Sequence, residues 1–210
     1  MSLRDAAHRV LSAPFIRPVW RALRDEQIVR KWQRAGSPVP PPHAYKQRVV
    51  KQFAERYDTT TLVETGTFQG EMVAAVEKYF SEVHTIELGA DLAAKATHKF
   101  RNHPRVHVYE GDSREVLRRI LPSVNSPTLF WLDAHYSEGI TARAEIDSPI
   151  SEELEIILAL QKRPIILIDD ARMFDGTKGY LTSDAVRKIV DTRRPGWSVK
   201  MEHDIFRVYP

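Results

Sequence analysis

The sequence contains no cysteine among its 210 residues, which excludes disulfides, thiolate zinc sites and thiol catalysis. No apolar run approaches the roughly 20 residues that a membrane span requires. Arg4, His8, Arg9 and Arg17 interrupt the N-terminal apolar residues, so a signal-peptide core is also missing. The eight histidines do not have the spacing of a zinc-binding helix. We therefore expect a cytoplasmic protein with no transmembrane segment.

The composition, 42% hydrophobic and 28% charged, is typical of a globular protein. The formal net charge of +3 is unevenly distributed, because residues 1–36 contain eight basic and three acidic residues and the remainder is slightly acidic. Nucleic-acid binding is therefore not expected of the main body. The basic N-terminal segment is expected to contact an anionic partner or membrane surface, or to pack on its own domain or on a second subunit of a homodimer.

A proline-rich linker marks the boundary of this segment. Residues 37–42 contain four prolines in five consecutive positions, which favours extended polyproline geometry. We expect a helical arm and linker over 1–42 and one main domain over 43–210. Within the arm, Pro14 and Pro18 predict two helical pieces, with an apolar stripe that needs a covering surface. The stripe comprises Val19, Trp20, Leu23, Ile28 and Trp32.

After an amphipathic segment at 43–57, short apolar segments alternate with longer amphipathic ones. Strands are predicted at 61–65, 82–88, 106–110, 127–133 and 164–169. Helices are predicted at 70–80, 90–101, 113–121 and 149–161, and a further one at 182–192. Strands 197–202 and 205–209, separated by a very short turn, are expected to form a hairpin. The pattern predicts an α/β fold, a Rossmann-like, doubly wound seven-stranded sheet with a terminal antiparallel hairpin.

The segment Glu64-Thr65-Gly66-Thr67-Phe68-Gln69-Gly70 joins the first predicted strand to the next helix. Two glycines four residues apart bracket a tight turn, an arrangement that brings backbone N–H groups against a nucleotide-like ligand.

Acidic residues follow the later strands, and the carboxyl ends of parallel strands meet at the ligand-binding edge of such a sheet. Glu87, about 20 residues past the glycine loop, is placed to accept hydrogen bonds from ribose hydroxyls. The alternative is a solvent-facing substitute for a helix N-cap. Asp112, followed by Ser113, is a candidate to contact a purine amino group, to cap the next helix, or to do both.

Three further carboxylates, those of Asp133, Asp169 and Asp170, are expected to converge at neighbouring strand ends. They would repel one another without a cation between them, and hard oxygen ligands favour Mg²⁺ or a similar ion. In the alternative interpretation one of the paired aspartates caps the following turn. His135 lies on the same rim, and its near-neutral pKa suits a general base, although a lone histidine is often structural.

These residues resemble the class I S-adenosylmethionine-dependent methyltransferases over about residues 43–210. The glycine loop has the spacing G-x-x-x-G and departs from the G-x-G-x-x-G of dinucleotide dehydrogenases. The resemblance implies that S-adenosylmethionine binds this loop, including Gly66, Thr67, Phe68 and Gly70, with Asp133 nearby. It also implies that Glu64 holds the donor's amino group, Glu87 its ribose and Asp112-Ser113 its adenine.

Within that family, Leu132-Asp133-Ala134-His135 and Ile168-Asp169-Asp170 are similar to the metal-binding strand ends of magnesium-dependent O-methyltransferases. The sugar O-methyltransferases of the macrolide and aminocoumarin type are the better match, because they carry an Asp-Asp pair and a base at the position of His135. The short basic chain also resembles the 1-O-methyltransferases of methylmannose polysaccharide synthesis. Catechol enzymes have a lysine where this chain has Tyr136.

The resemblance implies metal-assisted methyl transfer to a hydroxyl of a sugar or oligosaccharide acceptor, with Asp133, Asp169 and Asp170 as metal ligands and His135 as base. A phenolic or other small natural product is an alternative acceptor. A binding protein without turnover and a nicotinamide dehydrogenase are alternatives of other classes. Segments 37–46 and 136–147 are expected to close over the site. Tyr45 and Lys46 are candidates to reach the donor's carboxylate, and the alternative for Lys46 is an ordinary surface lysine. Tyr136, Arg143 and Arg172 are candidates to face the acceptor.

Overall fold

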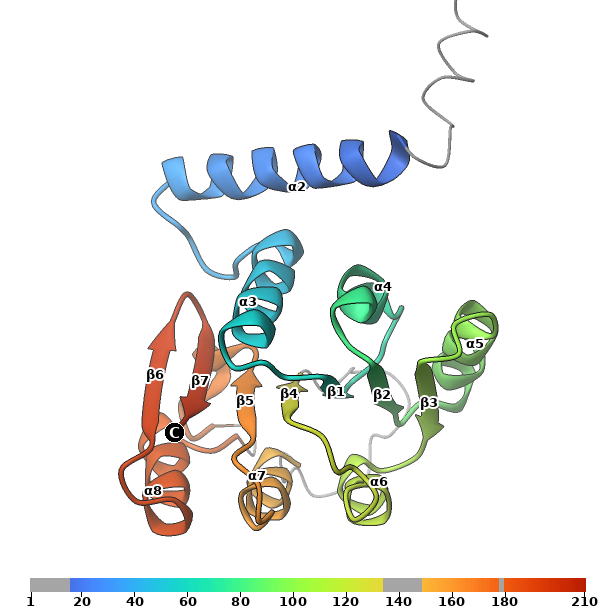
Figure 1. Ribbon diagram of the computed structural model, residues 1–210. Helices are drawn as coiled ribbons and strands as arrows, with labels where there is room; N and C mark the ends of the chain where they lie inside the picture. The colour runs from blue at the N-terminus through green and yellow to red at the C-terminus, as the bar shows by residue number, and fades with distance from the viewer. Residues whose placement is uncertain (1–15, 134–148, 178–179) are drawn as a thin grey trace, which may run out of the picture.

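A computed structural model describes residues 16–133, 149–177 and 180–210, which form a seven-stranded sheet between two layers of helices (Figure 1). The strand order is β3-β2-β1-β4-β5-β7-β6. Neighbours from β3 to β5 are parallel, and β7 is antiparallel to both β5 and β6. The strands are β1 (Thr61–Thr65), β2 (Glu82–Glu87), β3 (Val106–Glu110), β4 (Thr128–Leu132), β5 (Ile165–Ile168), β6 (Ser198–Glu202) and β7 (Ile205–Tyr209). The predicted doubly wound sheet with a terminal hairpin is confirmed.

The central strands β1, β4 and β5 are buried along their whole length. Their side chains alternate between two cores, because successive residues of a strand face opposite sides of a sheet. Val63, Phe130 and Ile166 are neighbours in register and share one core. Leu62 and Leu129, one residue earlier, lie in the other. Burial on both faces explains why these strands read as nearly continuous apolar runs.

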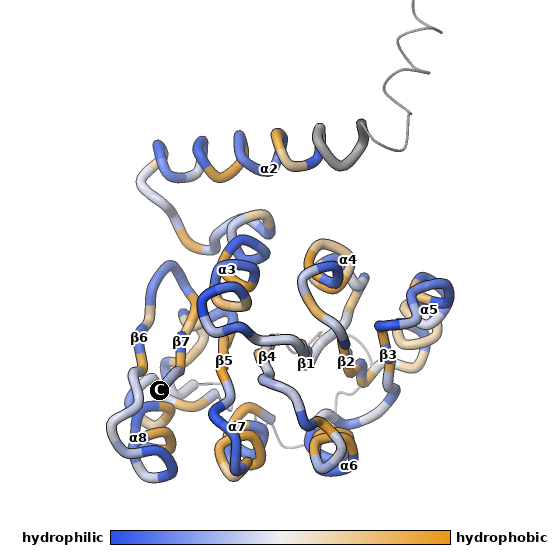
Figure 2. The backbone as a smooth tube through the Cα atoms, in the orientation of Figure 1, coloured by the Kyte–Doolittle hydropathy of each residue, from blue (hydrophilic) through white to orange (hydrophobic). Residues whose placement is uncertain are grey.

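Helices from the first half of the chain cover one face of the sheet, and helices from the second half cover the other (Figures 1 and 2). On one face lie α3 (His43–Arg56), α4 (Glu71–Val76) and α5 (Ala90–Phe100), and on the other α6 (Ser113–Ile120), α7 (Ile150–Leu158) and α8 (Ser183–Arg193). Short 3-10 helices η1 (Glu77–Tyr79) and η2 (Ala171–Met173) follow α4 and β5. The helix predicted at 70–80 is therefore a shorter α-helix that ends in a 3-10 turn.

The N-terminal arm differs from its prediction. Helix α2 (Ile16–Arg34) continues through Pro18 without a break, because the first turn of a helix has no acceptor for the N–H that proline lacks. Pro14 lies outside the described residues. The predicted apolar stripe is also wrong in part: Val29 and Trp32 are buried toward α3, whereas Trp20, Leu23 and Ile28 are exposed.

The proline-rich linker packs against α2 and α3, and the C-terminal hairpin ends in a tight turn. Trp32 Nε1 donates a hydrogen bond to the Pro38 carbonyl at 2.7 Å, and the Trp32 and Tyr45 rings lie 4.5 Å apart. His203 and Asp204, with φ of 48° and 66°, form the two-residue turn of the hairpin, as expected of a connection that matches strand twist.

None of the helices in the described part of the chain is long and apolar enough to cross a membrane.

Candidate active site

The glycine loop has the predicted strand–turn–helix geometry. After β1, the N–H groups of Gly66 and Thr67 both donate to the Ile86 carbonyl, at 2.9 and 3.2 Å. Gly66 and Gly70 have φ of +85° and +64°, in the region that favours glycine. A Cβ on Gly66 would lie 3.1 Å from Asp133 Cβ, and one on Gly70 would lie 2.7 Å from the Phe100 ring. Close packing therefore requires glycine at both positions.

Glu87 connects this loop to the end of β2. Its carboxylate accepts hydrogen bonds from Phe68 N at 2.7 Å and from Gly89 N at 2.9 Å. Because the residue is only 8% exposed, the solvent-facing alternative is wrong. A carboxylate has about four acceptor positions, so these two backbone bonds leave capacity for ligand hydroxyls.

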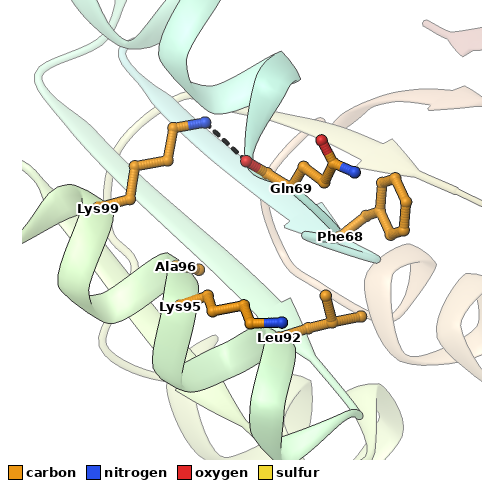
Figure 3. Close-up of a pocket in the computed structure, with 6 residues that line it drawn as sticks. All are labelled: Phe68, Gln69, Leu92, Lys95, Ala96 and Lys99. Carbon is orange, nitrogen blue, oxygen red and sulfur yellow. Dashed lines mark hydrogen bonds between the residues drawn. The ribbon is translucent and has the colours of Figure 1, made fainter.

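A hollow of about 220 Å³ lies between the loop and α5, lined by Phe68, Gln69, Leu92, Lys95, Ala96 and Lys99 (Figure 3). Lys99 Nζ donates to the carbonyls of Gln69 and Gly70, at 2.6 and 2.9 Å. The hollow therefore borders the glycine loop, and a basic side chain of α5 holds the loop's last turn.

Glu64 lies beneath the loop and is 2% exposed. Thr85, its neighbour on β2, donates to Glu64 Oε2 at 2.5 Å, and Thr67 Oγ1 lies 2.5 Å from the same hydroxyl. Burial raises the pKa of Glu64 to about 8. An ammonium group bound against this carboxyl would favour its ionised form.

Asp112 is the N-cap of α6 and accepts a hydrogen bond from Arg114 N at 2.8 Å, which confirms the predicted cap. The Arg114 guanidinium also bonds to its carboxylate, at 2.7 Å, and this hydrogen bond lowers the pKa of Asp112. Ser113 is the first residue of the helix.

The three predicted metal ligands do converge. One carboxylate oxygen from each of Asp133, Asp169 and Asp170 lies within 4.8 Å of the others. Asp169 and Asp170 are 3% and 2% exposed, and Asp133 is half-buried. Asp170 immediately precedes η2 but makes no side-chain cap there, so the capping alternative does not hold for this residue.

Lys46 lies buried among these acids, so the alternative of a surface lysine is wrong. From α3, its ammonium donates to Asp169 Oδ2 at 2.5 Å and to Asp170 Oδ1 at 3.4 Å. Burial alone would lower the pKa of Lys46, but the charges of Asp169 and Asp170 outweigh it and raise the pKa. Tyr45 points elsewhere, since its hydroxyl accepts from Arg207 at 3.2 Å.

Arg172, a predicted acceptor-facing residue, is also engaged in this network. Its Nη1 donates to Asp170 Oδ1 at 2.7 Å and pairs with Asp204. Among the described residues, Lys46 and Arg172 are the cations that pair with Asp169, Asp170 and Asp204. Burial and the charge of Asp170 raise the pKa of Asp169 to about 7, although Lys46 opposes the shift.

Three converging carboxylates are hard oxygen donors of the kind Mg²⁺ binds. The acid cluster of Asp133, Asp169 and Asp170 thus fits such an ion in the geometry and chemistry of its donor atoms. His135, Tyr136, Arg143 and the segment 136–147 lie outside the described residues.

Glu153 is a buried acid that sequence reasoning missed. It lies in the first turn of α7, is 1% exposed, and its Oε2 has no hydrogen-bond partner among the described residues. Burial raises the pKa of Glu153 to about 7. The sequence did indicate this burial, because Glu153 has helical spacing from the apolar residues Ile150, Leu154 and Ile157 of the buried helix face.

No family model and no curated protein matches the sequence. The structure is similar to an O-methyltransferase from Bacillus cereus solved in complex with S-adenosylhomocysteine. The match has 16% identity and a TM-score of 0.58, and covers 89% of this chain and 90% of that one. It is also similar to the O-methyltransferase TomG from Streptomyces achromogenes, which is involved in tomaymycin synthesis and was solved with S-adenosylmethionine. That match has 14% identity and a TM-score of 0.57, and covers 88% of this chain and 87% of that one.

The chain has the methyltransferase fold. Dinucleotide-binding sheets have the strand order 3-2-1-4-5-6, whereas here β7 is inserted between β5 and β6. In this methyltransferase fold the glycine loop follows β1, the acid cluster follows β4 and β5, and these central strands are adjacent in the sheet.

Proposed function

We propose that the protein transfers a methyl group from S-adenosylmethionine to a hydroxyl oxygen of a sugar or oligosaccharide acceptor. The observation that carries this proposal is the position of Gly66, whose Cα faces Asp133, so that a donor loop and an acid cluster adjoin. We assign the catalytic domain to residues 43–210 and treat 1–42 as an arm.

In the proposed donor half, backbone N–H groups of the loop from Gly66 to Gly70 lie against S-adenosylmethionine. Glu87 accepts hydrogen bonds from the ribose hydroxyls with the lone pairs that Phe68 N and Gly89 N leave free. Glu64 binds the donor's amino group in its ionised form, and Asp112 with Ser113 reads the adenine.

In the proposed acceptor half, Asp133, Asp169 and Asp170 hold a Mg²⁺ ion, and Lys46 and Arg172 offset the remaining negative charge. When bound, such a cation would orient the acceptor hydroxyl and lower its pKa. His135 takes the proton of that hydroxyl as the oxygen–methyl bond forms and the sulfur–methyl bond breaks. Alignment of the two reactants in a dry site supplies much of the remaining catalysis.

A phenolic or other small natural product is the second candidate acceptor. The similarity of the fold to TomG, an enzyme of tomaymycin synthesis, supports it. Assays of methyl transfer to glycosides and to catechols, side by side, separate the two acceptor classes.

The experiment has two stages. Calorimetry first measures binding of S-adenosylmethionine, and failure to bind at millimolar concentration would support a binding protein of another kind. An acceptor screen then follows, with wild type, Asp133→Asn and His135→Ala. We expect both variants to bind the donor and to lose at least about 100-fold in turnover. Full activity of wild type in EDTA would refute the metal role while leaving methyl transfer intact.

A further inference from the structure

Helix α2 presents one face away from the rest of the fold. Val29 and Trp32 are buried toward α3. Successive residues of an α-helix are about 100° apart around its axis. The positions of these two residues therefore determine which residues lie on the opposite side of the helix. In Figure 1 no described segment covers that side of α2. We define the outward face by the exposed residues at its centre, which are Trp20, Leu23, Arg24, Gln27, Lys31 and Arg34.

The outward face combines large apolar side chains with cations. Trp20 and Leu23 are 55% and 51% exposed, and Ile28, at the edge of the face, is 39% exposed. These residues are therefore available for burial by a partner. Figure 2 shows hydrophobic and hydrophilic positions interleaved along the helix.

The acids of α2 lie elsewhere on the helix. Asp25 and Glu26 are half-buried on the side toward α3. Glu26 is held there by Arg48 of α3, at 2.5 Å, and by Arg30, at 2.8 Å. Asp25 is 3.5 Å from Arg24, one of the cations of the outward face. The outward face itself therefore carries positive charge only.

We propose that this face binds the surface of an anionic lipid bilayer. Amphipathic helices with Trp and Leu among Lys and Arg lie in the membrane interface, where the apolar side chains enter the headgroup boundary and the cations meet anionic lipids. The helix lies parallel to the bilayer with Trp20 and Leu23 inserted and Arg24, Lys31 and Arg34 at headgroup level.

The charge distribution favours lipid over a second copy of this chain. A two-fold contact through the same face would bring its cations against themselves, and like charges directly opposed are repulsive. The exposed Trp20 and Leu23 favour a bilayer over a nucleic acid, which would use the cations but leave these side chains without an apolar environment.

The test is co-sedimentation of the full-length protein with vesicles of phosphatidylcholine alone or with added phosphatidylglycerol. We expect binding only to the anionic vesicles. Lys31→Glu with Arg34→Glu should weaken it at least about 25-fold, at about fivefold per basic residue. Trp20→Ser with Leu23→Ser should also abolish sedimentation. The matched control is Lys200→Glu with Met201→Ser on β6, another exposed pair of one basic and one apolar residue, which should bind as wild type does.

Several results would overturn the proposal. They are equal binding to neutral vesicles, no binding to either kind, and loss of binding in the β6 control to the same extent. Sedimentation equilibrium that shows a dimer dissociated by Trp20→Ser with Leu23→Ser would assign the face to a second copy. Binding of single-stranded RNA that depends on Lys31 and Arg34 but not on Trp20 would assign it to nucleic acid. Because α2 lies outside the proposed site, donor binding should be unchanged in every variant, so this test is independent of the proposed methyl transfer.

Discussion

Replacement of Lys46 by methionine tests the electrostatic balance of the acid cluster. The ammonium lies 2.5 Å from Asp169 and 3.4 Å from Asp170, and the side chains of all three residues are at most 10% exposed. Removal of one partner of such a buried pair costs about 3–5 kcal/mol, because the other charge is left uncompensated. For a chain of this size that loss corresponds to a decrease of roughly 10 °C in melting temperature.

The assay is thermal unfolding of wild type and Lys46→Met in EDTA and in Mg²⁺. We expect the full loss in EDTA and less than about half of it in Mg²⁺, because a bound cation would compensate the same carboxylates. Lys188→Met on the exposed side of α8 is the control, and its unfolding free energy should change by less than about 0.5 kcal/mol.

A loss below about 1 kcal/mol in EDTA would show that Lys46 does not neutralise the cluster, since that is the range of an exposed ion pair. A melting temperature that does not respond to Mg²⁺ in either protein would instead refute the cation site. The two outcomes are distinguishable, so the contact and the metal are tested separately.

Two further predictions concern the glycine loop and the buried acid of α7. Gly70→Ala should lower the free energy of unfolding by about 2–3 kcal/mol more than Gly36→Ala does, because its Cβ would meet the Phe100 ring whereas Gly36 has open space at a similar φ; equal losses in chemical denaturation would contradict this packing. Glu153 has a pKa of about 7 in the folded chain against an ordinary 4.5, so folding favours its protonated form and stability should fall by up to about 3 kcal/mol as pH rises from 4.5 to 7. Glu153→Gln should remove that part of the pH dependence and be the more stable protein at pH 8; an unchanged pH profile in urea unfolding would refute it.

The strands could be predicted because each carries a local signal. Segments such as Leu129–Leu132 and Ile165–Ile168 are buried on both faces, so they are apolar throughout and are bounded by polar or helical residues. The hairpin followed from two strand-like segments joined by His203 and Asp204. The convergence of Asp133, Asp169 and Asp170 followed from topology, because the ends of adjacent parallel strands must meet.

The contacts that were missed depend on packing between distant segments. Lys46 is 123 positions from Asp169, and a lysine in an amphipathic helix reads as exposed. The adjacent Glu152 and Glu153 differ only in which side of α7 faces the core. For α2, the apolar pattern indicated a buried stripe, but α3 covers Val29 and Trp32 and leaves Trp20 and Leu23 exposed.

The adjacency of β1 and β4 divides the proposed site along the chain. Residues 64–113 supply all of its donor side and residues 133–172 nearly all of its acceptor side, and the two meet where Gly66 lies against Asp133. A recombination point between α6 and β4 would therefore exchange one side and leave the other intact. New acceptor preferences can arise through replacement of the second part of the chain, provided that the incoming segment keeps an aspartate whose backbone N–H reaches the Thr65 carbonyl.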